Sequence, residues 1–376
     1  MTAKERKIVD ALRADIANGK FAEDDPLPSI RALATQYGVS AYIARHAIEE
    51  LARRNLVESR QGSGTYVTKR GQARKIGLVV PGLAYSEFFR PFADRIVQLC
   101  EKGGYKPVIR EGWSRPSLQR AKEVLSFVRQ LIRERVAGVV FQPLEYFPKA
   151  GYANRKIAKA LDEAGIPLVL VDSDIVPPPE RSKYDVVGIN NHDAGVRVAE
   201  HLLSSGIREI RFLLSRDADY NIRNRMRGVA SAVTAHGGEW GEANVLECAP
   251  NDVEAIRRAF RARPRPQAFV CRGDATASAL AKTLKRLGKR IPEDVTLVGF
   301  DDVAVASTMN PPLTTVRQPS EAIAVAAFRA LVGRIAVPSL PPCEIYLPAP
   351  LIVRASTRRE PDVPSGRKPA GRRSRG

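Results

Sequence analysis

Hydrophobic residues recur at helical spacing in the first part of the chain. Ile8, Leu12 and Ile16 lie four residues apart, so they predict an amphipathic helix with one buried face. Two more short helices and a pair of strands follow, at 30–37, 41–54, 56–59 and 65–68. Two helices joined by a tight turn and followed by a hairpin are typical of a winged helix-turn-helix, whose second helix can enter the major groove of DNA.

Polar and small residues mark the ends of these elements. Ser29 and Ser40 are suitable N-caps for the second and third helices, because a serine hydroxyl accepts a hydrogen bond from a free N–H of the first turn. A Gly-Ser-Gly tip at 62–64 allows the hairpin to turn. We therefore predict a DNA-binding domain over 1–68, followed by a short polar linker at 69–75.

From residue 76 onward, nearly all-apolar segments alternate with helical stretches. The strand-like segments lie at 76–80, 107–111, 137–142, 167–173, 185–190, 209–215, 267–271 and 295–301. Such alternation predicts parallel sheets that are covered by helices on both faces. The elements are too many for one small sheet, so we predict an α/β fold of two doubly wound lobes with a cleft between them.

The large part of the chain, 76–358, is divided between these lobes. We assign 76–188 and 319–333 to the first lobe, and 189–318 and 334–358 to the second.

The final segment, 359–376, has a different composition. It is rich in Arg, Lys, Pro and Gly, and its only large apolar residue is Val363. Such a segment cannot bury enough apolar surface to fold, so we predict a disordered basic tail.

The charge of the whole chain narrows the class of partner. Its 376 residues carry a formal net charge of +19 and a pI near 10.1. This balance favours a polyanion, DNA or RNA before a membrane, because the sequence has no long apolar span. A generally arginine-rich proteome is the alternative explanation of the charge.

The cysteines and the N-terminal residues indicate whether the chain binds a metal and where in the cell it resides. The four cysteines are far apart and form no C-x-x-C pair, and there are only four histidines, so we predict no metal and no cofactor. The first residues contain no apolar secretion signal, so we predict a cytoplasmic protein with reduced thiols and no membrane partner.

Residues 4–68 resemble the winged-helix domain of GntR-type bacterial repressors. The residues that carry the resemblance are Leu27-Pro28-Ser29, Arg31, Leu33-Ala34, Gly38-Val39-Ser40, Arg45, Leu51, Gly62 and Gly64-Thr65. Two departures concern the usual groove contacts: Ile30 stands where the family has Glu, and 41–43 read Ala-Tyr-Ile instead of Arg-x-Thr. Operator specificity must therefore depend on other residues.

The resemblance implies a DNA-binding surface on the recognition helix and the wing. Arginines there can hold phosphate or grip guanine, while wing glycines allow the backbone to approach phosphate closely. The predicted DNA-binding residues are Arg31, Ser40, Tyr42, Arg45, Arg60, Gln61, Gly62, Gly64 and Thr65. A solvated helix face and an ordinary hairpin turn are the alternative interpretations.

Residues 75–357 resemble the effector domain of LacI-type sugar repressors, which is similar to periplasmic sugar-binding proteins. The carriers are Asn191-His192 with Gly195, Glu200-His201-Leu202, Arg225 with Gly228, Ile291-Pro292-Glu293-Asp294-Val295, Val298-Gly299-Phe300-Asp301-Asp302 and Pro311-Pro312-Leu313-Thr314-Thr315-Val316. The LacI headpiece and hinge helix are absent. The combination is similar to the GntR–LacI hybrid regulators.

This second resemblance implies a sugar site between the lobes. A sugar needs a charged fork, a carboxylate acceptor and an aromatic face, and in parallel sheets ligands collect at the carboxyl ends of the strands. The predicted effector-binding residues are Tyr85, Phe89, Asp172, Arg225, Arg272, Asp274 and Asp301. The Asn-Asp pair of the family reads Gly273-Asp274 here, which removes one expected contact.

A catalytic function is not indicated. Asp301 and Asp302 form a carboxylate pair in sequence, but neighbours at a strand end point to opposite faces. No motif for a nucleophile, a phosphate loop or a metalloprotease is present.

We therefore predict a dimeric regulator that binds operator DNA, a repressor relieved by a sugar effector. The alternatives are an activator, a regulator with a non-sugar effector, and a sugar-binding receptor.

Overall fold

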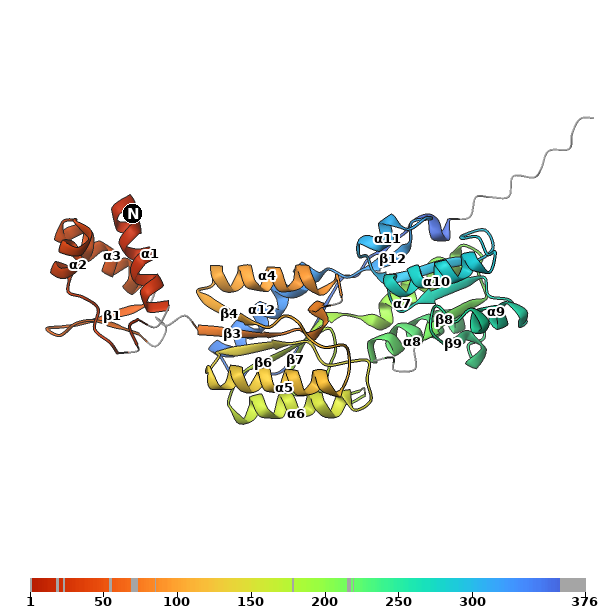
Figure 1. Ribbon diagram of the computed structural model, residues 1–376, viewed down its shortest axis with the longest axis horizontal. Helices are drawn as coiled ribbons and strands as arrows, with labels where there is room; N and C mark the ends of the chain where they lie inside the picture. Colours follow the sequence, from red (N-terminus) through yellow and green to blue (C-terminus); the bar gives the residue numbers. More distant parts are fainter. Residues whose placement is uncertain are drawn as a thin grey trace, which may run out of the picture.

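The structure, a computed structural model, describes residues 2–17, 20–22, 24–53, 56–68, 74–84, 86–177, 179–214, 218 and 220–358. These residues form a small helical domain with a hairpin, and two six-stranded sheets flanked by helices (Figure 1). The predicted α/β fold, a winged helix-turn-helix with two doubly wound lobes, is confirmed.

The N-terminal domain consists of three helices and a hairpin. They are α1 (Ala3–Ala17), α2 (Ile30–Tyr37), α3 (Ala41–Arg53), β1 (Val57–Arg60) and β2 (Gly64–Val67). The two strands pair antiparallel, with Val57 opposite Val67, and Pro26 forms a bridge to Tyr66 on the other edge of β2. Ile8, Leu12 and Ile16 of α1 are buried, as their spacing predicts.

The first lobe contains a parallel sheet in the order β13-β7-β6-β5-β3-β4. Its strands are β3 (Arg74–Val79), β4 (Tyr105–Ile109), β5 (Gly138–Phe141), β6 (Leu168–Val171), β7 (Asp185–Ile189) and β13 (Glu344–Leu347). Helices α4 (Phe89–Lys102) and α12 (Ser320–Ala336) pack together on one face, and α5 (Leu118–Arg133) and α6 (Ala150–Glu163) on the other (Figure 1).

The second lobe repeats this plan, with the strand order β14-β12-β11-β10-β8-β9, except that the edge strand β14 pairs antiparallel with β12. Its strands are β8 (Ile210–Leu214), β9 (Val245–Glu247), β10 (Ala268–Cys271), β11 (Thr296–Asp301), β12 (Thr314–Arg317) and β14 (Leu351–Ile352). Helices α7 (Asn191–Ser204) and α8 (Tyr220–Ala235) pack tightly together, while α9 (Val253–Arg261) contacts α10 (Asp274–Arg286). The short α11 (Ala304–Thr308) follows β11.

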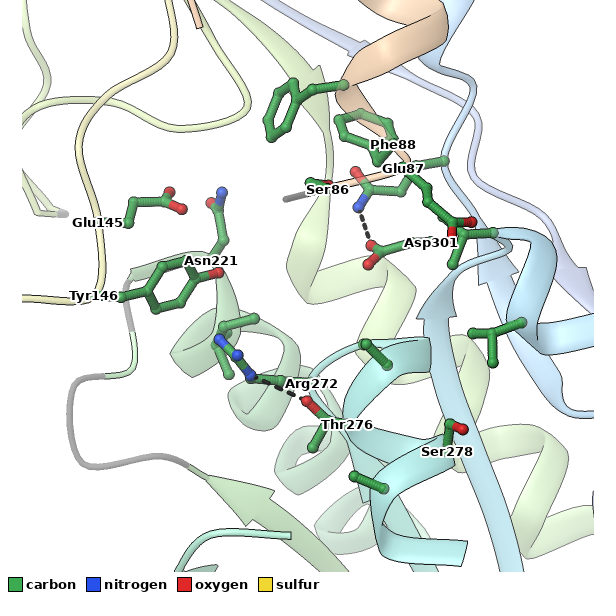
Figure 2. Close-up of a pocket in the computed structure, with 18 of the residues that line it drawn as sticks. Ser86, Glu87, Phe88, Glu145, Tyr146, Asn221, Arg272, Thr276, Ser278 and Asp301 are labelled. Atoms are coloured by element: carbon green, nitrogen blue, oxygen red, sulfur yellow. Dashed lines mark hydrogen bonds between the residues drawn. The ribbon is translucent and has the colours of Figure 1, made fainter. Parts of the chain in front are cut away.

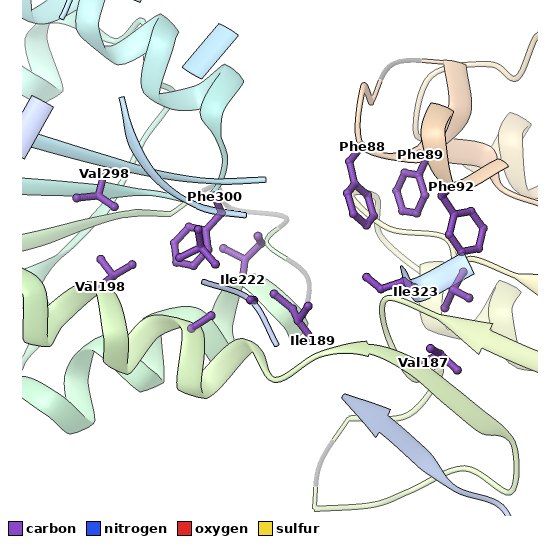
Figure 3. Close-up of a cluster of buried hydrophobic side chains, with 14 of the residues drawn as sticks. Phe88, Phe89, Phe92, Val187, Ile189, Val198, Ile222, Val298, Phe300 and Ile323 are labelled. Carbon is purple, nitrogen blue, oxygen red and sulfur yellow. The ribbon is translucent and has the colours of Figure 1, made fainter. Parts of the chain in front are cut away.

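The chain crosses between the lobes three times, from β7 to α7, from β12 to α12 and from β13 to β14. Buried side chains on both sides of these crossings belong to one hydrophobic cluster. Figure 3 shows Phe92 and Ile323 in the first lobe and Val198 and Phe300 in the second. Crossings that are anchored in packed cores can act as a hinge without loosening either lobe.

One predicted boundary between the two lobes is wrong. The second lobe was expected to contain all of 334–358, but α12 extends to Ala336 and β13 pairs parallel with β7 of the first sheet, with Tyr346 opposite Gly188. The strand was missed because an edge strand is only half-covered, so β13 alternates exposed and half-buried positions instead of forming an apolar run.

The predicted linker is also shorter than expected. β3 begins at Arg74, which pairs with Tyr105, so 74–75 belong to the first sheet. The rest of the linker, 69–73, and the predicted tail at 359–376 lie outside the described residues.

Two glycines explain the tight contact between α7 and α8. A Cβ on Gly195 would overlap the carbonyl oxygen of Arg225, and a Cβ on Gly228 would overlap that of His192. Only residues without a side chain allow the two helix backbones to approach so closely. This contact places Asn191, at the start of α7, next to Arg225 of α8.

We predict that Gly195→Ala destabilises the second lobe. The added methyl group must push α7 and α8 apart, and overpacking of this kind costs about 1–3 kcal/mol. The matched control is Gly241→Ala, because a Cβ at Gly241 meets nothing within 4 Å. The free energy of unfolding, measured by urea denaturation, should fall for the first variant only; equal stability of the two variants would contradict the prediction.

Candidate DNA-binding surface and ligand cleft

The helix-turn-helix is fixed by three local contacts. The Ser29 hydroxyl accepts a hydrogen bond from the Ala32 N–H at 3.2 Å, and the Ser40 hydroxyl accepts one from the Ile43 N–H at 3.4 Å. Between the helices, Gly38 has a φ of 61° and its N–H bonds to the Ala34 carbonyl. Glycine adopts this left-handed conformation without strain, so the turn can close.

The recognition helix α3 presents its polar face to solvent. Ala44, Ala47, Ile48 and Leu51 are buried against the domain core. Tyr42 is 66% exposed and lies against His46, with ring centroids 4.3 Å apart.

Two of the predicted arginines, Arg31 of α2 and Arg45 of α3, are exposed. Within the described part of the chain, the guanidinium groups of Arg31 and Arg45 make no ion pair, so both are available to phosphate or base edges.

The wing brings glycines and an arginine to its tip. Gly62 and Gly64 have φ values of 74° and 124°, which favour glycine, and both are exposed together with Gln61. Arg60 is already engaged, because its guanidinium pairs with Asp24 at 2.6 Å and Glu58 at 2.7 Å. It must exchange these carboxylates for phosphate if it contacts DNA. Thr65 is half-buried, and its hydroxyl lies 3.4 Å from the Ser59 hydroxyl.

Between the lobes lies a cleft of about 750 Å³, lined by the ends of strands and the loops that follow them (Figure 2). The structure brings five of the predicted residues together there: Phe89, Asp172, Arg225, Arg272 and Asp301. Gln142 also lines the cleft, and its side-chain oxygen accepts a hydrogen bond from the Gly82 N–H at 2.9 Å. Tyr85 lies outside the described residues.

Arg225 is the most constrained residue of the cleft. It is only 4% exposed, and its Nε donates to Asn191 Oδ1 at 2.8 Å while Nη1 donates to the Arg272 carbonyl at 2.7 Å. The guanidinium lies 4.5 Å from the centroid of the Phe300 ring and 4.0 Å from Asp301 Oδ1. These contacts fix its orientation before any ligand arrives.

Asp301 ends β11 and is paired with a residue that the sequence analysis missed. Its Oδ1 accepts a hydrogen bond from Gln318 Nε2 at 2.6 Å. Gln318 is 7% exposed and lines the cleft, and its Oε1 has no hydrogen-bond partner among the described residues. A buried acceptor without a donor is costly, so this end of the cleft suits a ligand that donates a hydrogen bond. The signal in the sequence was a polar residue directly after the strand at 314–317.

The structure corrects the prediction for Asp274, which is fully buried and does not line the cleft. Its Oδ1 accepts from the Thr315 hydroxyl at 2.6 Å, and its Oδ2 accepts from the Val303 N–H at 3.0 Å. Burial, followed by the repulsion of Asp301, raises the pKa of Asp274 to about 7. Its carboxyl group connects α10 to β12 and to the loop after β11, beneath the cleft wall.

Gly273, the residue before Asp274, shapes the wall of the cleft. A Cβ at Gly273 would lie 3.0 Å from Asp301 Oδ2. The absence of a side chain at Gly273 therefore leaves space beside the Asp301 carboxylate at the cleft.

Three further contacts join the lobes across the cleft. Glu87 Oε2 accepts from the Ala304 N–H at 3.1 Å, and Asn221 Nδ2 donates to the Asp172 carbonyl at 3.0 Å. The Arg272 guanidinium lies 4.7 Å from the centroid of the Tyr146 ring. Figure 2 shows Glu87 near Asp301, and Tyr146 near Arg272 at another part of the cleft. Asp172 and Arg272 were predicted as site residues, but their cross-lobe partners Asn221 and Tyr146 were not. The contact between Glu87 and Ala304 was also missed, because no sequence motif marks either residue.

Comparisons with known proteins agree with this geometry. Residues 4–67 match the model for bacterial regulatory proteins of the gntR family, and residues 199–357 match a periplasmic binding protein-like domain. The chain joins a gntR-family DNA-binding domain to a periplasmic-binding-protein-like domain. This regulator is similar along most of its length to the arabinose metabolism transcriptional repressor of Geobacillus stearothermophilus, with 28% identity over 91% of this chain and 94% of the relative.

A second relative matches a large part of the chain. The HTH-type transcriptional regulator CelR of Thermobifida fusca is 29% identical over 78% of this chain and 83% of its own. A solved CelR–cellobiose complex has the same fold, with a TM-score of 0.64 and 23% identity over 93% of this chain and 98% of that structure. These relatives are transcription regulators, and the chain is a DNA-binding transcription regulator rather than an enzyme.

Two searches of the described residues concern metals and membranes. No group of three or more His, Cys, Asp or Glu side chains in this part of the protein could hold a metal ion. Within the same part, no helix combines the length and apolar character that a bilayer span requires.

We predict that Asp274 makes stability depend on pH. Since its folded-state pKa of about 7 lies above the ordinary value of 3.8, the folded chain keeps a proton that the unfolded chain loses. The contribution of this group to the free energy of unfolding is complete below about pH 4. It falls by about 1.4 kcal/mol per pH unit between about pH 4 and pH 7, and it stays constant above that range. Asp274→Asn should remove this slope in urea denaturation at pH 5 and pH 7; parallel curves for both proteins would contradict it.

Proposed function

We propose that this regulator is a cytoplasmic repressor of carbohydrate-utilisation genes, whose hold on operator DNA is relieved by a sugar effector. The observation that carries the proposal is the orphaned Gln318 acceptor beside Asp301, in a cleft that belongs to the same chain as a winged helix. Relatives named for arabinose metabolism, and a neighbour solved with cellobiose, support a sugar.

The chemistry of the cleft suits a polyhydroxylated ligand. Asp301 and Gln318 offer acceptors for hydroxyl groups, and Arg225 and Arg272 supply fixed donors on the same side. Phe88 and Phe89 form an edge-to-face pair at the other wall, with ring centroids 4.8 Å apart, which suits the C–H surface of a sugar ring. Few polar groups at fixed positions, together with an apolar face, are typical of small-molecule sites.

We infer that the effector acts by closing the lobes. It would strengthen the contacts across the cleft, such as Glu87 with the Ala304 N–H and Arg272 with Tyr146, and so rotate one lobe against the other. In a homodimer that rotation changes the spacing of two winged helices seated on half-sites roughly 34–36 Å apart. A coupling free energy of about 1–3 kcal/mol shifts operator occupancy about 5- to 150-fold.

Two alternative functions, an activator and a regulator with a non-sugar effector, would have the same architecture and would differ only in their effect on transcription or in their ligand. An activator would share every feature described, as would a regulator that responds to a non-sugar ligand. A sugar-binding receptor is disfavoured, because the gntR-family domain at 4–67 has no role in such a protein.

The test uses an operator selected from a pool of random DNA sequences by the purified protein. A panel of pentoses, hexoses and their phosphates is first screened by thermal shift, because a ligand that binds only the native state raises Tm. A sugar that raises Tm should also lower operator affinity. A sugar that occupies the cleft yet leaves operator binding unchanged would refute the proposed coupling.

We predict that Arg45→Ala weakens binding to the selected operator by about 1–3 kcal/mol, the usual value of a good base contact. The matched control is Arg13→Ala, which removes an equally charged, exposed side chain from α1. Gel-shift titrations should separate the two variants, and equal losses would argue against a specific role for Arg45.

We predict that Gln318→Leu lowers effector affinity by about 1–3 kcal/mol, because the ligand loses a buried hydrogen-bond acceptor. Operator binding without effector should remain at the wild-type level, since Gln318 directly follows β12, which Figure 1 shows far from the winged helix. Gln98→Leu, an exposed change on α4, is the control. Calorimetric titration that gave wild-type affinity for Gln318→Leu would exclude the residue from the site.

A further inference from the structure

The first turn of the recognition helix α3 carries a large aromatic side chain on its exposed face. This residue, Tyr42, is 66% exposed, and its neighbours Ala41 and Ile43 have apolar side chains. The N-terminal residues of a recognition helix contact base edges in the major groove. Hydrogen-bonding groups for such contacts must therefore come from Tyr42 and, one turn later, from Arg45 and His46.

Tyr42 and His46 form a pair on this face. They lie four residues apart, a spacing that places two side chains on the same side of a helix. Their ring centroids are 4.3 Å apart and the rings are tilted by 36°. Contact with the imidazole restricts the position of the Tyr42 ring, while most of that ring stays exposed. We call these two residues the Tyr42–His46 pair.

The start of α1 orients the second member of the pair. Glu5 is buried there, and its Oε2 accepts a hydrogen bond from the Thr2 N–H at 2.6 Å. The other oxygen of this carboxylate, Oε1, lies 3.9 Å from His46 Nδ1. A carboxylate so close favours a proton on Nδ1, because the negative charge attracts the N–H. In the neutral imidazole Nε2 is then an acceptor, and no residue of the described chain donates to it.

The two rings together offer an apolar surface and a hydrogen-bond acceptor side by side. In the major groove thymine is the base that presents a methyl group, and apolar side chains contact it. Its partner adenine presents an amino group, N6, that donates hydrogen bonds. Cytosine also presents an amino donor, but a C·G pair has no methyl group. A T·A pair is therefore the base pair that satisfies both members at once.

We propose that the Tyr42–His46 pair reads one T·A base pair in each half-site of the operator. The Tyr42 ring packs against the thymine methyl group, and His46 Nε2 accepts a hydrogen bond from adenine N6. Neither Arg-containing nor charged contacts are needed for this step, so the pair selects sequence while exposed arginines such as Arg45 add affinity. This recognition concerns the operator alone and does not depend on which effector the cleft binds.

The first test selects operators from a pool of random DNA sequences with the full chain, either wild-type or carrying Tyr42→Ala or His46→Ala. Selection takes place at about pH 8, where a histidine side chain is ordinarily neutral. The matched controls are Tyr152→Ala, which removes a tyrosine that is 63% exposed on α6, and His236→Ala, which removes an exposed histidine just after α8.

The wild-type and control proteins should select a T·A pair at one position of each half-site, and both pair variants should lose that preference. A base contact of this kind discriminates about 5- to 150-fold against the wrong base pair. Selection of guanine by the wild-type protein at the position that the variants alter, or unchanged selection by the variants, would overturn the proposal.

The second test removes single groups from the selected DNA. Deoxyuridine in place of the thymine deletes its methyl group and should lower wild-type affinity about fourfold, the value of burying one carbon group. Purine deoxyriboside in place of the adenine deletes its amino group and should lower affinity about fivefold, the value of one hydrogen bond. Tyr42→Ala should be insensitive to the first change and His46→Ala to the second, because the protein partner is already absent.

Tyr42→Phe separates recognition from a purely structural role. Phenylalanine keeps the ring, so this variant should still distinguish thymine from deoxyuridine. Tm is measured for every variant to confirm that it is folded. If the pair only stabilised α3, its loss would weaken binding to all sequences equally, and the altered bases would affect the variants as they affect the wild-type protein. That result would also refute base recognition by the pair.

Discussion

The buried guanidinium of Arg225 is the interaction on which the ligand cleft depends. It ties the start of α7, through Asn191, to the end of β10, through the Arg272 carbonyl, and it lies against Phe300 of β11. Three elements from distant parts of the chain thus form one wall with fixed positions. Without the close approach of α7 and α8 that Gly195 and Gly228 permit, this arginine would not reach its partners.

Charge is distributed unequally over the molecule. The cleft combines acceptors such as Asp301 and Gln318 with buried or half-buried arginines, so its polarity is balanced. The recognition helix carries exposed cations such as Arg45 instead. A neutral, hydroxyl-rich ligand and a polyanion can therefore be bound by one chain without competing for the same groups.

Much of the site could be predicted, because strand ends are visible in an apolar pattern. Asp172 and Asp301 lie at the ends of such apolar runs. Arg225 was predicted from the resemblance to LacI-type proteins. All three residues line the cleft. Asp274 follows a strand as well, yet its side chain turns inward to Thr315, a contact that depends on the packing of β12. Gln318, Glu87 and Tyr146 were missed because their roles come from neighbours more than a hundred residues away, or from an orphaned atom that only coordinates reveal.

The sequence by itself determined the type and order of the elements, because periodicity, serine caps and glycine turns are local properties of the chain. It also determined the excess of positive charge. The tertiary structure alone decided which strands share a sheet, as with β13, and which polar atoms meet across the cleft. Those pairings join residues far apart in the chain, and their energies depend on distances that no local pattern encodes.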